Sequence, residues 1–474
     1  MTDAQPPVQT SAPSAVQSAA VELLCPAGTF RNLQYAFAYG ADAVYAGQAR
    51  YSLRVRNNDF DEENLAKGIA YAHALGKKFY VVVNIQAHNA KLDTFIRDIT
   101  PVVQMQPDAL IMSDPGLIML VREHFPQQAI HLSVQANAVN WATVKFWQNM
   151  GISRVILSRE LSVKEIAQIH AQVPDIELEV FVHGALCMAY SGRCLLSGYI
   201  NRRDANQGTC TNACRWQYQT HQASENAAGD IVPVVQTHDP ASAVPAEKIP
   251  TLGIGAPSDA VVLLEDPNRP GELMPMYEDE HGTYIMNSKD LRAVALVPEL
   301  IDIGVHSLKI EGRTKSHYYV SRTAQVYRQA IDDHLAGKPF DPGLIHQLDG
   351  LANRGYTEGF LRRHVHAAYQ TYDSGNSRLD SQQFVAEVID ASPEWLTLDI
   401  KNKLSVGDVI EIMTPQGNLT CVLETMTDLE GAPIPAALGS GWHCRIPNPF
   451  TALPSAVLRF ALILKNLHTT PDPA

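Results

Sequence analysis

The chain has few cysteines, few basic residues and short apolar runs. Only 7 of its 474 residues are cysteine, and the formal net charge is -13. The longest apolar stretches, KKFYVVVNI from Lys77 and DALIMSDPGLIML from Asp108, are shorter than the roughly 20 residues that cross a bilayer. We therefore expect no membrane segment. The shortage of Lys and Arg argues against a general nucleic-acid binder, although local basic groups remain.

Residues 1–20 (MTDAQPPVQTSAPSAVQSAA) lack the basic and apolar regions of a secretion signal, and we expect them to be a disordered tail. The protein is then expected in the cytoplasm. A reducing compartment disfavours disulfides, so clustered cysteines are more readily explained by metal binding or catalysis.

From residue 22 to about residue 330, short β-branched runs alternate with amphipathic helical patterns. Eight strands are predicted, at residues 22–28, 41–47, 77–84, 108–114, 130–137, 154–160, 176–184 and 306–313. Strands that alternate with helices pair in parallel, and eight such units indicate an α/β fold, a TIM-like (β/α)8 barrel, over residues 21–370.

Two segments depart from this alternation. About 120 residues separate the seventh and eighth predicted strands, and we interpret residues 185–280 as a cysteine-rich insertion. From residue 382 to residue 465 short alternating runs predict a small C-terminal antiparallel β-barrel, with the boundary in the polar segment 371–381.

Polar residues stand where most of the predicted strands end, for example Asn84, Ser113, Gln135 and Asn137. In a barrel these ends share the rim on which active sites are built. The alternative for any one of them is that a loop simply begins there.

Four cysteines lie close together as Cys-x6-Cys-x15-Cys-x3-Cys, at Cys187, Cys194, Cys210 and Cys214. Four thiolates suit an iron–sulfur cluster, and the wide first gaps favour a cluster over zinc, whose structural sites prefer ligands two to four residues apart. Zinc and ordinary buried thiols remain alternatives.

Three further residues are candidates for acid/base work. His183 precedes Cys187 by four residues and ends a predicted strand, so it is a candidate proton donor or base. It could equally be a hydrogen-bonded structural histidine, or pair with Cys187 as a protease dyad. Glu160 and Glu311 are candidate acid/base groups whose neighbouring arginines could instead make them ion pairs.

Arginines supply the candidate anion-binding groups. Arg50, Arg54 and Arg56 follow the second predicted strand, and Arg313 follows the eighth. Guanidinium groups on an extended loop can grip carboxylate or phosphate, whereas the alternative is a solvated surface run.

The segment EVFVHGALCMAYSGRCLLS, from Glu179 to Ser197, resembles the signature of the collagenase-like peptidase family U32. The resemblance continues in order through PAG, YGADAVYAG, RYSLRVRNNDF, LSVQANAVN and KIEGRTKSHYYV, and covers most of residues 22–465. It is strongest to a branch of the family that is associated with tRNA hydroxylation.

That resemblance implies an enzyme that converts wobble uridine, in the tRNA anticodon loop, to 5-hydroxyuridine. The step is linked to prephenate as co-substrate and to the iron–sulfur assembly machinery. Related members bind a [4Fe-4S] cluster through four cysteines, which correspond here to Cys187, Cys194, Cys210 and Cys214. The C-terminal domain would either help to grip the tRNA stem or stabilise the barrel.

Two other functions stay open from the sequence. The family name suggests a peptidase, but the chain contains neither a GxSxG elbow nor an HExxH helix. The third alternative is a non-catalytic scaffold that binds tRNA or prephenate.

Overall fold

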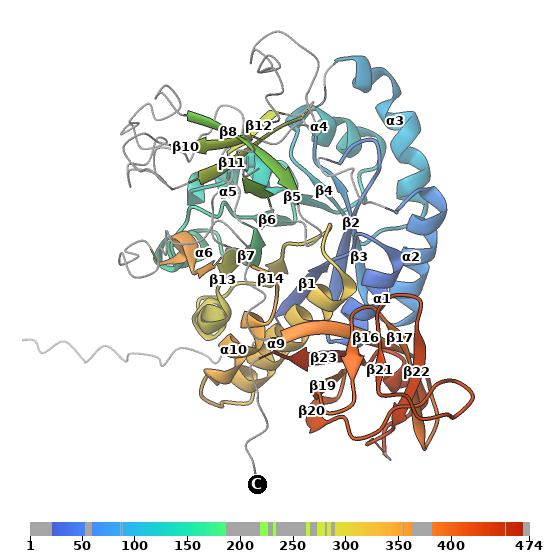
Figure 1. The fold of residues 1–474 in the computed structure, drawn as a ribbon. Coiled ribbons are helices and arrows are strands. Elements are labelled where there is room, and N and C mark those ends of the chain that lie inside the picture. Colours follow the sequence, from blue (N-terminus) through green and yellow to red (C-terminus); the bar gives the residue numbers. More distant parts are fainter. Residues whose placement is uncertain are drawn as a thin grey trace, which may run out of the picture.

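The computed structural model describes residues 21–52, 59–85, 87, 89–185, 219–225, 231–233, 262–265, 273–279, 282–285, 290–353, 355–362, 382–450 and 452–467. Eight parallel strands form a closed barrel (Figure 1). They are β1 (Glu22–Pro26), β2 (Ala43–Gly47), β3 (Lys78–Val83), β4 (Ala109–Met112), β5 (Ile130–Leu132), β6 (Arg154–Ile156), β7 (Glu177–Ala185) and β14 (Ser307–Ile310). Because β14 pairs with both β1 and β7, the barrel closes, and the predicted fold class is confirmed.

Helices surround the barrel and cover its apolar outer face. They are α1 (Phe30–Ala38), α2 (Glu62–Ala74), α3 (Asn89–Gln104), α4 (Pro115–His124), α5 (Trp141–Asn149), α6 (Val163–Gln172), α8 (Val297–Asp302), α9 (His317–Leu335) and α10 (Gly343–Asp349). Several begin at a capping residue whose side-chain oxygen accepts a backbone N–H of the first turn, as Asp114 does for α4 and Ser162 for α6. Within the described part of the chain, no helix is both long and apolar enough to cross a membrane.

Between β7 and β14 the chain forms an antiparallel sheet that the sequence did not predict. Its strands are β8 (Gln219–Glu225), β9 (Ile231–Pro233), β10 (Val262–Glu265), β11 (Leu273–Asp279) and β12 (Gly282–Ile285). The chain then returns to the barrel at β13 (Asp290–Arg292), which pairs antiparallel with the end of β7 and parallel with β15 (Tyr356–Thr357). Most of the predicted insertion, residues 185–280, lies outside the described residues, as does the predicted tail 1–20.

The C-terminal domain is a six-stranded antiparallel sheet in the order β20-β19-β23-β16-β17-β22. The bounds of its elements are β16 (Gln382–Ala391), β17 (Trp395–Ile400), β18 (Leu404–Ser405), β19 (Val409–Thr414), β20 (Gly417–Val422), β21 (Ala436–Ala437), β22 (His443–Pro447), α11 (Ser455–Leu458) and β23 (Leu462–Asn466). Among the described residues the pairing does not continue from β20 to β22. Instead, Thr427 pairs with Arg445 on the outer edge of β22 through two backbone hydrogen bonds of 2.9 and 2.8 Å. The predicted C-terminal β-barrel is therefore an open antiparallel sheet among these residues. The predicted boundary, 371–381, lies outside the described residues.

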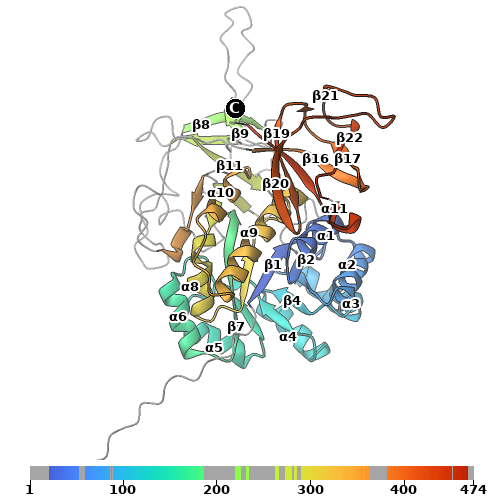
Figure 2. The same ribbon diagram turned by 90° about the horizontal axis from the view of Figure 1, so that it is seen from below.

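The C-terminal domain packs against α1 and α9 of the barrel (Figure 2). Tyr39, which directly follows α1, donates its hydroxyl to the Phe460 carbonyl at 2.8 Å. Arg322 of α9 is fully buried and lies 2.8 Å from Glu411. A buried charge that is paired and hydrogen-bonded in this way fixes the orientation of the two domains at their contact.

Candidate functional site

The carboxyl ends of the barrel strands form one mouth, and the first polar group there comes from β3, β4 and β5. Asn84 Nδ2 lies 2.6 Å from Gln135 Oε1 and 3.3 Å from Ser133 Oγ. The Ser133 hydroxyl donates to Gln135 Oε1 at 2.5 Å, and the Ser113 hydroxyl donates to the Asn84 carbonyl at 2.9 Å. This amide cluster, defined by Asn84, Ser113, Ser133 and Gln135, ties three consecutive strand ends together.

The second group comes from the ends of β6 and β14. Arg159 forms an ion pair with Glu311, and its guanidinium carbon lies 3.8 Å from the centroid of the Phe181 ring. The Ser158 hydroxyl donates to Glu160 at 2.6 Å. Both predicted acid/base carboxylates are therefore at the mouth. Glu311 is in an ion pair, as its alternative interpretation proposed, and its partner is Arg159.

The arginines predicted to bind anions lie in different places. Arg313 Nη1 donates to Ser52 Oγ at 2.8 Å, and a Cβ on Gly47 would collide with both side chains. Arg50 is half-exposed beside α3, where it pairs with Asp98. Arg54 and Arg56 lie outside the described residues. The structure therefore brings Arg313, but not Arg50, to the junction between the β14 and β2 strand ends.

Below the mouth, the barrel interior holds an ion network made of Glu22, Arg154, Glu179 and Lys309. Lys309 Nζ lies 2.7 Å from Glu179, and Arg154 Nη1 lies 3.3 Å from Glu179 and 2.5 Å from Glu22. Burial lowers the pKa of Lys309, which the charge of Glu179 opposes. The sequence did not predict this network, although each of its four residues lies in a different predicted strand.

His183 packs outside the barrel, against α9. On β14, Lys309 pairs with Phe181 and the next residue pairs with His183, so β7 carries one extra residue, a β-bulge that redirects the side chain. The His183 ring lies 5.5 Å from the Tyr327 ring, and burial lowers its pKa to about 3. A neutral, fully buried imidazole among tyrosines favours the structural alternative over the predicted role in proton transfer.

The four clustered cysteines, Cys187, Cys194, Cys210 and Cys214, lie outside the described residues. The other three are free thiols in the described part, and burial raises the pKa of Cys444 to about 12 and that of Cys25 further still. Such thiols stay protonated and are poor metal ligands. Among the described residues there is also no group of three or more His, Cys, Asp or Glu side chains that could hold a metal ion.

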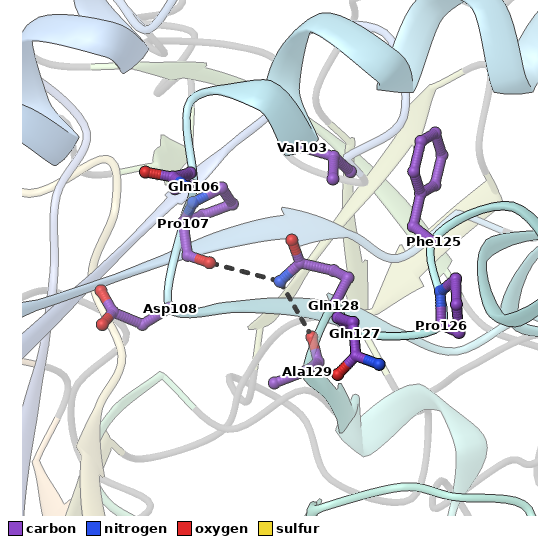
Figure 3. Close-up of a pocket in the computed structure, with 9 residues that line it drawn as sticks. All are labelled: Val103, Gln106, Pro107, Asp108, Phe125, Pro126, Gln127, Gln128 and Ala129. Atoms are coloured by element: carbon purple, nitrogen blue, oxygen red, sulfur yellow. Dashed lines mark hydrogen bonds between the residues drawn. The ribbon is translucent and has the colours of Figure 1, made fainter.

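A surface hollow occupies the opposite end of the barrel, between the loops that precede β4 and β5 (Figure 3). Its Gln128 amide donates to the carbonyls of Pro107 and Ala129 at 3.2 and 3.3 Å. Asp108, also in its lining, accepts the backbone N–H of Phe79 at 2.8 Å. These groups hold loops together, and active sites of such barrels lie at the other end, so the mouth is the better candidate.

The mouth therefore combines amide and hydroxyl groups on one side with an arginine–carboxylate pair on the other. An open amide nitrogen can donate to carbonyl oxygens, a guanidinium can hold an anion, and Glu160 and Glu311 can accept protons or N–H groups. The sequence identified Asn84 and Gln135 as rim residues without giving them a role. Their hydrogen bonds depend on the spatial order of the strands, which the sequence alone does not display.

Comparison with known proteins identifies relatives along nearly the whole chain. The chain is 64% identical over 456 residues to tRNA hydroxylation protein P of Escherichia coli, covering 95% of this chain and 98% of that protein. It is 33% identical to tRNA hydroxylation protein P1 of Bacillus subtilis, over 88% of this chain and 89% of that protein. It is 30% identical to the 23S rRNA 5-hydroxycytidine C2501 synthase of Escherichia coli, over 84% of this chain and 53% of that protein.

Among solved structures, a U32 peptidase aligns with a TM-score of 0.30 at 13% identity, over 38% of this chain and 73% of that one. That similarity is too slight to add to the argument. The model of peptidase family U32 matches residues 28–371, and the model of the family's C-terminal domain matches residues 380–459. The chain therefore belongs to peptidase family U32.

Proposed function

We propose that this chain hydroxylates uridine in tRNA, forming 5-hydroxyuridine at the wobble position of the anticodon. The observation that carries the proposal is the 64% identity, over 95% of the chain, to a protein named for tRNA hydroxylation. A more distant relative is named as a 5-hydroxycytidine synthase of ribosomal RNA, which is the corresponding chemistry on the other pyrimidine.

The barrel mouth is compatible with such a substrate. Bases of an anticodon loop are single-stranded, so one base can be splayed into a protein pocket. With a net charge of -13, the protein must bind RNA phosphates through local basic groups. Arg50, Lys91 and Arg97 form one such group on and beside α3; the Lys91 ammonium lies 3.3 Å from the Arg50 carbonyl, and the Arg97 side chain is 73% exposed.

The proposal includes a [4Fe-4S] cluster held by Cys187, Cys194, Cys210 and Cys214 and loaded by iron–sulfur assembly proteins. Its support is the donor set itself, since four cysteines follow β7 closely in sequence, the first of them two residues after Ala185. When bound, a cluster of this kind supplies electron transfer or activation of an oxygen donor, or organises the segment around it.

Prephenate is the proposed co-substrate. It is a dicarboxylate, and guanidinium groups are suited to hold carboxylates. Of the four arginines predicted for this role, Arg313 lies at the strand ends, where its Nη1 donates to Ser52 Oγ.

The test is nucleoside mass spectrometry of tRNA from Escherichia coli cells that lack their own tRNA hydroxylation protein and any second enzyme that makes the same nucleoside. Wild-type protein should restore 5-hydroxyuridine, and Cys187→Ala should not. Cys421→Ala is the matched control, because Cys421 lies in the C-terminal sheet, and it should restore the product like wild type. Absence of 5-hydroxyuridine with wild-type protein would refute the proposal.

The cluster is tested separately by absorbance of protein purified without oxygen. Wild type and Cys421→Ala should show the broad visible absorbance of an iron–sulfur cluster, and Cys194→Ala should lose it. Equal iron and sulfide contents in all three proteins would contradict the assigned ligands.

A further inference from the structure

The side-chain amide of Gln135 is held in one orientation at the barrel mouth. Its oxygen accepts from Asn84 Nδ2 at 2.6 Å and from the Ser133 hydroxyl at 2.5 Å. Asn84 and Ser133 are only 6% and 2% exposed, so neither donor is free to move away. With Asn84 Nδ2 facing Gln135, reversing the Gln135 amide alone would place two NH2 groups 2.6 Å apart, which is strongly unfavourable.

The backbone that carries Gln135 is fixed as well. Gln135 is the middle residue of η1 (Val134–Ala136), a single 3-10 turn that follows β5 directly. The residue that follows this turn, Asn137, has φ of 50°, and its Nδ2 donates to the Gln135 carbonyl at 3.0 Å. Asparagine adopts this left-handed conformation more readily than other non-glycine residues, so Asn137 ends the turn and fixes the direction of the backbone after Gln135.

This anchoring leaves the amide nitrogen as the open end of the side chain. Among the described residues Gln135 Nε2 has no hydrogen-bond partner, and the side chain is half-buried. The nitrogen carries two N–H donors and no acceptor. A ligand group at this position must therefore be an acceptor, such as a carbonyl oxygen.

The two pyrimidines differ at this kind of group. Uracil has a carbonyl oxygen on C4, next to the C5 atom, whereas cytosine has an amino group there, which only donates. We propose that Gln135 binds the O4 atom of the target uracil, selects uracil over cytosine, and brings C5 to the mouth of the barrel. This inference rests on the proposed function and adds to it the residue that recognises the base.

The test is Gln135→Glu, which exchanges the open NH2 for an oxygen at nearly unchanged size. One carboxylate oxygen can still accept from Asn84 and Ser133, and the other now faces the ligand as an acceptor. Such an exchange should repel O4 of uracil and accept the amino group of cytosine. Gln104→Glu on α3, which is exposed, is the matched control for the added charge.

Two measurements test the inference. One uses the full-length protein purified without oxygen, and the other uses cells that express it. Fluorescence anisotropy gives the affinity for anticodon hairpins that carry either uridine or cytidine at the target position. Mass spectrometry gives hydroxylated uridine and cytidine in cells that express tRNA with either base. Wild type should prefer uridine, and Gln135→Glu should shift the uridine-to-cytidine ratio by about tenfold or more, since one base-edge contact discriminates by about that factor.

The ratio separates recognition from a structural role. If Gln135 had only a structural role, the change would weaken binding of both hairpins equally. An unchanged uridine-to-cytidine ratio in a folded Gln135→Glu protein would therefore overturn the inference. Formation of 5-hydroxyuridine by the wild-type protein in the same experiment would still support the proposed function. If Gln135→Glu does not fold, Gln135→Met carries the test, and its uridine preference should fall toward one. Absence of any product with wild-type protein would refute both proposals.

Discussion

The two ends of the barrel interior carry similar side chains in different states. At the amino end, Glu22, Arg154, Glu179 and Lys309 are almost completely buried, and each charge contacts an opposite one. At the carboxyl end, Arg159 and Glu311 are paired but partly exposed, at 15% and 14% of their side chains. We infer that the closed end supports stability and the mouth supports binding and chemistry, as in other barrels of this class.

The physical reason for this division is the cost of desolvation. A buried charge costs several kcal/mol unless partners compensate for it, so the interior network tolerates little change. At the mouth, water can reach part of the ion pair, and the same charges can exchange partners for a ligand at a smaller cost.

The largest expected effect is that of Arg154→Met. The change leaves Glu22 buried without its arginine partner and removes one of the two cations at Glu179, so we expect a loss of about 3–5 kcal/mol in the free energy of unfolding. Denaturant unfolding followed by circular dichroism measures this loss. Arg97→Met, at an arginine that is 73% exposed, is the control and should change stability by less than about 0.5 kcal/mol. Equal effects of the two changes would contradict the comparison.

A smaller effect is expected for Glu22→Gln, and it should depend on pH. Burial alone would raise the pKa of Glu22, but the charge and hydrogen bonds of Arg154 and a hydrogen bond from Tyr80 lower it below its ordinary 4.5. A carboxyl whose pKa is lowered by folding contributes stability above the pKa of the unfolded chain, and that contribution is lost as the pH falls below about 4.5.

Melting temperatures between pH 7 and pH 3.5 measure this dependence. Glu22→Gln should melt below wild type at pH 7, by the equivalent of about 1–3 kcal/mol, because a buried charged partner is lost. The gap should narrow toward pH 3.5, because below about 4.5 the unfolded chain binds a proton that the folded carboxyl, with its lowered pKa, binds less readily. A gap that stays constant with pH would show that the charge of Glu22 does not stabilise the fold.

Local sequence patterns were sufficient to predict the barrel. All eight predicted strands are present, because β-branched runs and amphipathic helices in alternation favour parallel pairing over this length. The predictions were too long at the strand ends, as for residues 130–137, where only Ile130–Leu132 is strand and a 3-10 turn follows. The sheet β8–β12 was missed because β8 is almost entirely polar and β9, β10 and β12 are too short to show an apolar alternation.

The site was predictable only in part. Strand-end polarity identified Asn84, Gln135, Glu160 and Glu311, since these positions follow from the strand boundaries alone. The position of His183 was not predictable, because it depends on one extra residue in β7 opposite β14. Pairing between distant residues, such as Lys309 with Glu179, likewise depends on the closure of the barrel.

The smallest expected effect on stability is that of Glu311→Gln at the mouth, and it should come with a large effect on activity. The amide can still accept a hydrogen bond from Arg159, so we expect a change of about 1 kcal/mol or less in the free energy of unfolding. Removal of the carboxylate should lower formation of 5-hydroxyuridine by about 100-fold if Glu311 transfers a proton, in line with general acid–base catalysis. Glu311→Asp, which keeps the charge, should restore part of the product. Full activity of Glu311→Gln would show that Glu311 only positions Arg159. A loss of stability as large as that of Arg154→Met would contradict the inferred difference in tolerance to change between the two ends of the barrel.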